Sequence, residues 1–162
     1  MRVSEIMNKM ILYSHGNTHD INHFLKVYGY AKTIGECEGL PPDEQETLEI
    51  AAILHDIACP LCREKYGNTD GKKQEEEGMP LVRNFLDGLV EKEMIERIAY
   101  LVGHHHTLTD IEGMDYQILI EADYLVNADE NNYLEDNIRN MLEKVFKTDT
   151  GKMLLKAIYR ID

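Results

Sequence analysis

Four side chains of metal-binding type stand within apolar helical patterns: His23, the adjacent pair His55 and Asp56, and Asp123. Each follows or precedes apolar residues by three or four positions, which places it on the same side of an expected helix as those residues. An imidazole or carboxylate that points into an apolar interior is costly unless it has a partner. A metal ion would be such a partner for all four.

Two imidazoles and two carboxylates suit a borderline divalent ion, namely Mn, Fe, Co, Ni or Zn. Mg is less favoured because it prefers an all-oxygen shell. An ion that accepts six ligands would keep positions free for water and substrate, which is typical of a catalytic site. Taken singly, each residue has an ordinary alternative. A lone buried His is more often a hydrogen-bonded core residue, and a lone Asp is more often a cap or a surface group.

A second motif, Cys59-Pro60-Leu61-Cys62, has the C-x-x-C spacing of a redox site or of half a zinc site. A thioredoxin-like motif opens a helix, whereas here a helix is expected to end at the motif. A zinc site would need two more ligands, and the remaining cysteine, Cys37, stands alone. We therefore expect the two thiols to pack as small apolar side chains. A redox protein stays as the rival interpretation, and replacing both cysteines with Ser would test it.

The elements that position these residues follow a helical period, and no segment shows sustained period-2 alternation. The sequence thus predicts an all-α fold, a compact helical bundle in one domain over residues 1–162. One helix is expected from Thr18, as its N-cap, to Gly39, and another opens after Pro42 with Asp43 and Glu46 at capping-box spacing. That second helix is expected to run until Cys59-Pro60 stops it. Residues 60–73 are expected to form a loop, and further helices to cover 3–11, 74–88, 91–105, 115–130, 132–147 and 150–160.

Composition limits the partners. Seventeen basic against thirty acidic side chains give a formal net charge of −13, which argues against a nucleic-acid polymer as the partner. The sequence contains neither the apolar core of a signal peptide nor a stretch long enough to span a bilayer. An odd number of cysteines, three, suggests reduced thiols. We expect a cytoplasmic protein without a membrane partner. The oligomeric state stays open, with a homodimer as one option.

The ordered pattern His…His-Asp…Asp in "DINHFLKVYGYA", "IAAILHDIA" and "IEADYLVNADE" resembles the HD-domain superfamily of metal-dependent phosphohydrolases. The resemblance covers residues 20 to about 130. It implies an all-helical fold, one or two divalent metal ions held by His23, His55, Asp56 and Asp123, and phosphoester hydrolysis. Asp56 would orient the attacking water or accept its proton.

The run His104-His105-His106 ends an expected helix, and His105 lies nearest the inner stripe of that helix. Many superfamily members place one or two histidines at a similar point. We therefore predict a site role for His105, with His104 as the second candidate. A solvated helix end is the alternative. Members with two metals often carry a further His where this chain has Gln74 to Glu77, so the metal count stays open.

The expected substrate is a nucleotide or another small phosphoester, attacked by metal-activated water. The nearest basic residues to the motifs are Lys26, Lys65, Lys72, Lys73 and Arg83. Two further classes remain as alternatives: a di-iron oxygenase of the same fold, and a non-catalytic module that binds a metal or a nucleotide.

Overall fold

The computed structural model describes residues 2–162, which form an all-helical fold without a strand in this range. The helices are α1 (Arg2–Tyr13), α2 (Thr18–Glu38), α3 (Pro42–Leu54), α4 (Cys59–Tyr66), α5 (Gly71–Leu86), α6 (Lys92–Val102), α7 (Met114–Glu130), α8 (Glu135–Lys144) and α9 (Asp149–Tyr159). The predicted fold class is confirmed.

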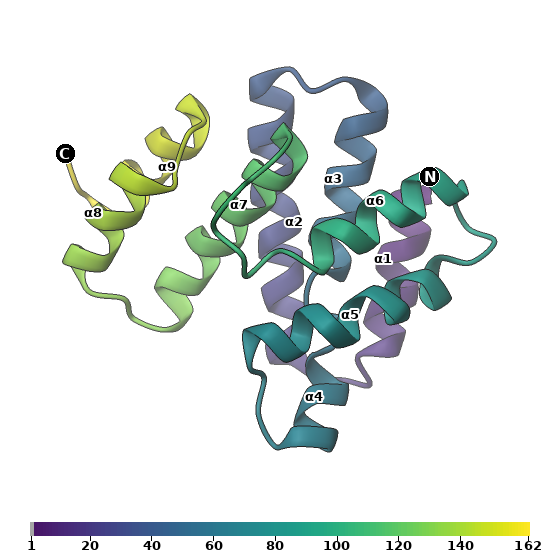
Figure 1. Cartoon of the computed structure of the whole chain (residues 1–162). Coiled ribbons are helices and arrows are strands. Elements are labelled where there is room, and N and C mark those ends of the chain that lie inside the picture. The colour runs from purple at the N-terminus through teal and green to yellow at the C-terminus, as the bar shows by residue number, and fades with distance from the viewer. Residues whose placement is uncertain (1) are drawn as a thin grey trace.

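Helices α2, α3 and α7 pack against one another at the centre (Figure 1). Residues 47–54 of α3 and 115–126 of α7 are all buried, because both helices are apolar around most of their circumference and neighbours cover them on several sides. Helices α1 and α6 pack on α3, α5 packs on α6, and α9 packs on α2 and α7. The four predicted ligands come from these central helices or directly follow them.

The segment after α3 differs from the prediction. Helix α3 ends at Leu54, residues 55–58 form turns, and a new helix, α4, begins at Cys59 where a loop was expected. Pro60 lies in the first turn of α4, where its missing N–H costs nothing because the first amides of a helix lack intrahelical partners. The prediction treated this proline only as a helix stop and was therefore wrong.

Two predicted caps also differ. The N-cap of α2 is Asn17, whose side-chain oxygen accepts a hydrogen bond from the backbone amide of Asp20, so Thr18 is the first helical residue. The N-cap of α3 is Pro41, which makes no side-chain capping bond, so no capping box forms there. Asn has the stronger capping preference because its short side chain reaches the free amides.

A buried carboxylate joins α7 to the start of α9. Glu121, which is fully buried, accepts hydrogen bonds from the side chains of Gln117 and Thr148 and from the backbone amides of Lys147 and Thr148. Helices α8 and α9 thus lie beside the central bundle, at the end far from the N-terminus (Figure 1).

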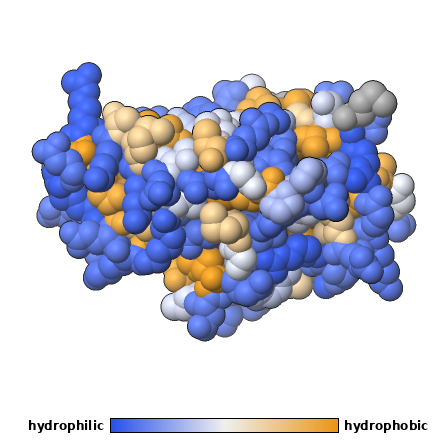
Figure 2. All heavy atoms as spheres, turned by 90° about the horizontal axis from the view of Figure 1, so that it is seen from above, coloured by the Kyte–Doolittle hydropathy of each residue, from blue (hydrophilic) through white to orange (hydrophobic). Residues whose placement is uncertain are grey.

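The face seen in Figure 2 is mainly hydrophilic, with apolar side chains in separate patches. Within residues 2–162, no helix has both the length and the apolar content that crossing a membrane requires.

Candidate metal centre and its cleft

The fold brings the four predicted ligands to one point. His23 comes from α2, His55 and Asp56 from the turn after α3, and Asp123 from α7. His23 Nε2 lies 3.1 Å from His55 Nε2, 3.2 Å from Asp56 Oδ2 and 3.2 Å from Asp123 Oδ1. His55 Nε2 lies 3.4 Å from Asp56 Oδ2 and 3.3 Å from Asp123 Oδ1. We refer to these four residues as the HD cluster.

The turn after α3 is what allows two adjacent residues to face the same point. On a regular helix, neighbours in sequence project about 100° apart and do not converge. Helix α3 ends at Leu54, residues 55–58 form turns, and His55 and Asp56 both reach His23.

The spacing of the donor atoms fits one metal ion. Ligand atoms about 2.1 Å from a common ion lie about 3.0 Å apart at right angles and about 3.4 Å apart in a tetrahedron. The five distances given above, which join each histidine to the other and to the two carboxylates, are 3.1 to 3.4 Å and fall in this interval.

The protonation of the His23 and His55 rings also fits a metal ion bound between them. His23 Nδ1 donates to Glu130 Oε2 at 2.8 Å, and His55 Nδ1 donates to the carbonyl oxygen of Ala52 at 2.7 Å. Since a carboxylate and a carbonyl only accept, both Nδ1 atoms carry hydrogen, and in the neutral rings both Nε2 lone pairs face the cluster. Two lone pairs 3.1 Å apart repel each other unless a proton or a metal ion lies between them. A histidine held in this way by a second group is the usual arrangement of a metal ligand.

The electrostatics of the HD cluster favour a cation. Burial alone would lower the pKa of His55, but the carboxylates of Asp56 and Asp123 outweigh it and raise that pKa well above its usual value. Burial opposes ionisation of both aspartates, yet the positive charge of His55 holds the pKa of each below its usual range. The two carboxylates therefore stay ionised and retain positive charge beside them.

A second group of potential ligands shares Asp56 with the first. His105 Nε2 lies 3.5 Å from Asp56 Oδ1, and His106 supplies a third donor atom nearby. His105 Nδ1 donates to the carbonyl oxygen of Val102, while its Nε2 is buried without a hydrogen-bond partner among the described residues. A buried polar atom without a partner needs an explanation, and a metal ion or a ligand atom would provide one. The structure thus places His105 beside Asp56, and its predicted role in the site stays a prediction.

His104 lies elsewhere. Its ring stacks on Tyr100 with 4.0 Å between centroids, and its Nδ1 donates to the Tyr100 carbonyl oxygen. Helix α6 ends at Val102, so the three histidines occupy a turn in which His106, and not His104, accompanies His105. The sequence prediction extended this helix to residue 105, three residues beyond its end in the structure. His106 Nε2 lies 3.0 Å from Gln74 Oε1, so Gln74 contacts this second group through a histidine.

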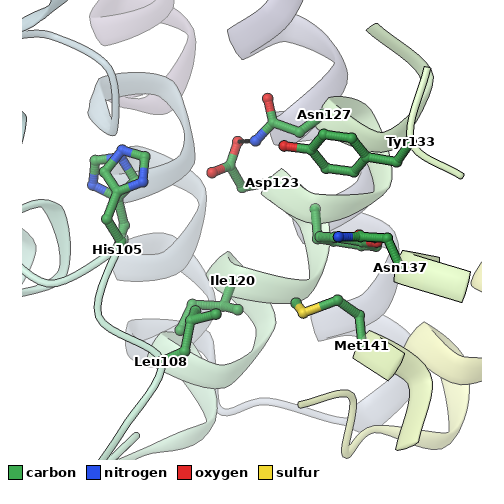
Figure 3. Close-up of a pocket in the computed structure, with 10 residues that line it drawn as sticks. His105, Leu108, Ile120, Asp123, Asn127, Tyr133, Asn137 and Met141 are labelled. Atoms are coloured by element: carbon green, nitrogen blue, oxygen red, sulfur yellow. Dashed lines mark hydrogen bonds between the residues drawn. The ribbon is translucent and has the colours of Figure 1, made fainter. Parts of the chain in front are cut away.

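Two hollows flank the HD cluster. The first, of about 240 Å³, lies between α7, α8 and the segment 103–113, and we call it the α7–α8 cavity (Figure 3). The second, of about 320 Å³, lies between the start of α2, α4 and the end of α7, and we call it the α2–α4 cavity. Asp123, Asn127, Tyr133 and His106 line both, so the HD cluster lies at their junction.

The cleft contains residues that the sequence interpretation did not identify. Asn127 donates to Asp123 Oδ1 at 2.9 Å, and Glu130 holds His23. Both follow Asp123 at helical spacing, four and seven positions on, so the same-face rule could have found them. Among residues 2–162, Arg63 is the only Lys or Arg that lines either hollow, and it forms two 2.7 Å bonds with Asp20. It was missed because α4 was expected to be loop.

The basic residues that the sequence suggested are engaged elsewhere or lie outside the lining. Lys65 pairs with Glu77, Arg83 pairs with Glu96, and Lys73 lies over the ring of Tyr66. Lys26 approaches Glu130 at 3.5 Å but remains half exposed.

The two cysteines of the C-x-x-C motif are buried, unpaired thiols, as expected. The motif does open a helix, contrary to the prediction, which would usually lower the pKa of the first thiol. Burial and the nearby charge of Asp56 act more strongly and raise the pKa of Cys59 well above its usual value. A protonated, buried thiol is a poor nucleophile, so this geometry does not favour a redox role.

The fold and the HD cluster define an all-α protein with a candidate divalent-metal centre in an open cleft. A family model described as "HD domain" matches residues 20–150, and the chain therefore belongs to the HD-domain family, a superfamily of metal-dependent hydrolases.

Comparison with solved structures gives the same fold. A "predicted HD superfamily hydrolase" from an uncultured Thermotogales bacterium is similar, with a TM-score of 0.69 and 21% sequence identity. The match covers 97% of this chain and 84% of that one. The comparison with curated proteins produced no match.

Proposed function

We propose that this protein is a metal-dependent phosphohydrolase that acts on a nucleotide or another small phosphoester. The observation that carries the proposal is the HD cluster itself, in which two Nε2 atoms and two carboxylate oxygens converge between two hollows. A structural metal site is closed by its protein ligands, whereas this one leaves room for water and substrate. A divalent ion held by His23, His55, Asp56 and Asp123 would polarise water and neutralise phosphoryl oxygens.

The chain's own residues have separable roles in this proposal. Asp56 is the half-buried member of the cluster, and it contacts both ligand groups, through Oδ2 and Oδ1. It is therefore the carboxylate best placed to orient a water molecule or to take its proton. His105, with its unpartnered Nε2, is placed to hold a phosphoryl oxygen or a second ion.

Arg63 is proposed to hold the phosphate. Its guanidinium can form two parallel hydrogen bonds with an anion, as it already does with Asp20. A substrate phosphate could replace or share that contact, because Arg63 is partly exposed on the cleft wall. The single cation suits a small substrate and gives little support for a nucleic-acid polymer as partner. A cytoplasmic location is part of this proposal, and the free thiols support it.

The number of ions is part of the same proposal. Asp56, His105 and His106 form a second group whose donor atoms lie within 4.8 Å of one another. This group supports a second metal position, with Asp56 as a ligand shared with the HD cluster. A di-iron oxygenase would also need two metal positions. That alternative predicts oxygen consumption on an organic substrate, whereas a phosphohydrolase releases inorganic phosphate without oxygen.

The test is a metal-depleted preparation reloaded separately with Mn, Co, Ni, Fe, Mg and Zn. Each form is assayed for phosphate release from nucleotides and sugar phosphates, for conversion of cyclic nucleotides to the monophosphate, and for oxygen uptake with iron. We expect phosphate release with at least one transition metal and its loss in His55→Ala. Oxygen uptake without phosphate release would favour the oxygenase, and metal binding without either activity would favour a binding module.

A further inference from the structure

The α7–α8 cavity has separate polar and apolar parts. Asp123, Asn127 and the hydroxyl end of Tyr133 face one another on one side, while Leu108, Ile120 and Met141 form the opposite side (Figure 3). Asn137 lies between the two parts in this view. The polar side is continuous with the HD cluster through Asp123, so a group that reaches from the metal centre into the cavity would pass from polar to apolar surroundings.

The charges of this cavity disfavour an anionic occupant in the part that lies away from the HD cluster and His105. None of its lining residues, all within the described chain, is a Lys or an Arg, and Asp123 lies at its polar side. An anion placed against Leu108, Asn137 and Met141 would have no Lys or Arg beside it, which is costly in a partly desolvated site. Phosphate oxygens are better served in the α2–α4 cavity, where Arg63 lies.

The volume of the cavity and its polar groups limit which ligands it can bind. About 240 Å³ lies below the range of roughly 300–1,000 Å³ that takes drug-sized ligands, so one small ring-bearing group fits better than two. The hydroxyl of Tyr124 donates to Asn137 Oδ1, which orients that amide and leaves its Nδ2 free to donate. Tyr133, which is 39% exposed, offers an aromatic face or edge at the mouth.

We infer that the α7–α8 cavity binds the organic part of the substrate, and that this part is a single uncharged ring system with a hydrogen-bond acceptor, of the size of a nucleoside. Asn137 and Tyr133 are the residues that determine its specificity. The inference rests on the proposed function for the position of the phosphate. The binding of an uncharged ring in this cavity is a separate property that can be measured without turnover.

The experiment measures binding first. Metal-free protein is titrated with adenosine, guanosine, cytidine and uridine, with ribose 5-phosphate for comparison, by saturation-transfer NMR. Met141→Trp fills the apolar side from α8, and Leu108→Trp fills it from the segment 103–113, where the side chain is 44% exposed and tolerates change. The matched control is Met153→Trp, the same substitution at a 55% exposed position on α9. Thermal melts show whether each variant is folded.

We expect at least one nucleoside to bind, with affinity about tenfold or more weaker in the two cavity variants and unchanged in Met153→Trp. With metal restored, kcat/KM should fall for the matching nucleoside monophosphate and stay within about twofold for ribose 5-phosphate. If Met141→Trp does not fold, Leu108→Trp gives the answer alone.

Two results would overturn the inference: no nucleoside binds the wild-type protein, or binding persists in Leu108→Trp. Failure of the proposed function looks different. In that case no metal-loaded form releases phosphate from any substrate, while nucleoside binding and its loss in the cavity variants still support the cavity as a ring-binding site.

Discussion

Glu130 should control the metal affinity of the HD cluster although it is not one of its ligands. Its Oε2 accepts the hydrogen bond from His23 Nδ1 at 2.8 Å, and both side chains are largely buried, 13% and 6% exposed. The bond fixes the ring so that Nε2 faces His55 and Asp123, and the carboxylate charge makes that nitrogen a better donor to a metal. Glu130→Gln keeps the shape and one acceptor oxygen but removes the charge, while Glu130→Ala removes both.

The expected loss of metal affinity differs between the two variants. Loss of a group that holds a ligating His typically costs ~10–100-fold in metal affinity, or about 1.4–2.7 kcal/mol. Glu130→Gln should fall near the lower end because an acceptor remains 2.8 Å from the ring. Glu130→Ala should fall near the upper end, because the buried Nδ1–H then loses its partner. Lys26, half exposed at 3.5 Å from Glu130, should contribute little.

The assay is competition of Mn or Co between the metal-free protein and a chelating dye at fixed pH. Asp129→Asn is the matched control, since it removes one negative charge from an exposed neighbour on the same helix. If Glu130→Gln and Asp129→Asn lowered the metal affinity equally, the reasoning would be refuted, because the loss would then come from the change in net charge and not from the orientation of His23. Unchanged affinity in Glu130→Ala would refute it outright.

Three further outcomes are expected. Asp56→Asn at saturating metal should lower turnover by ~10²–10⁴-fold if Asp56 handles the proton of the water, and near-normal steady-state rates would remove it from that role. Gly151→Ala should lower the free energy of unfolding, measured with denaturant, by about 1–3 kcal/mol, because the new Cβ would lie 1.9 Å from Oε1 of the buried Glu121. Gly29→Ala is the control, since no atom lies within 4 Å of its new Cβ, and it should be neutral or stabilise the fold by up to about 1 kcal/mol. His105→Ala should reduce phosphate release, because this side chain lies beside Asp56. His104→Ala should leave the metal content unchanged and should lower only the stability, through the lost stacking with Tyr100. Equal loss of metal in both variants would place His104 at the site.

The sequence by itself determined the fold class and singled out four residues whose side chains the structure brings together. The helical period is local, so it can be read along the chain, and an ordered set of imidazoles and carboxylates within apolar patterns calls for a shared partner. The seven histidines of the chain could not be sorted by composition. The spacing of His23 and His55 relative to apolar residues distinguished these two from His15 and His19.

Only the tertiary structure decided how these residues meet and what surrounds them. Helix α3 ends at Leu54, and His55 and Asp56 in the following turn meet His23 of α2 at one point, which no local pattern records. The choice of His106 over His104 depends on where α6 stops, and the position of a helix end is set by competing contacts as much as by propensity. Arg63 reaches the cleft because α4 carries it past the start of α2, forty-three positions earlier in the chain. Contacts between residues so far apart arise from the packing of whole helices, and the sequence shows the helices without showing which faces will meet.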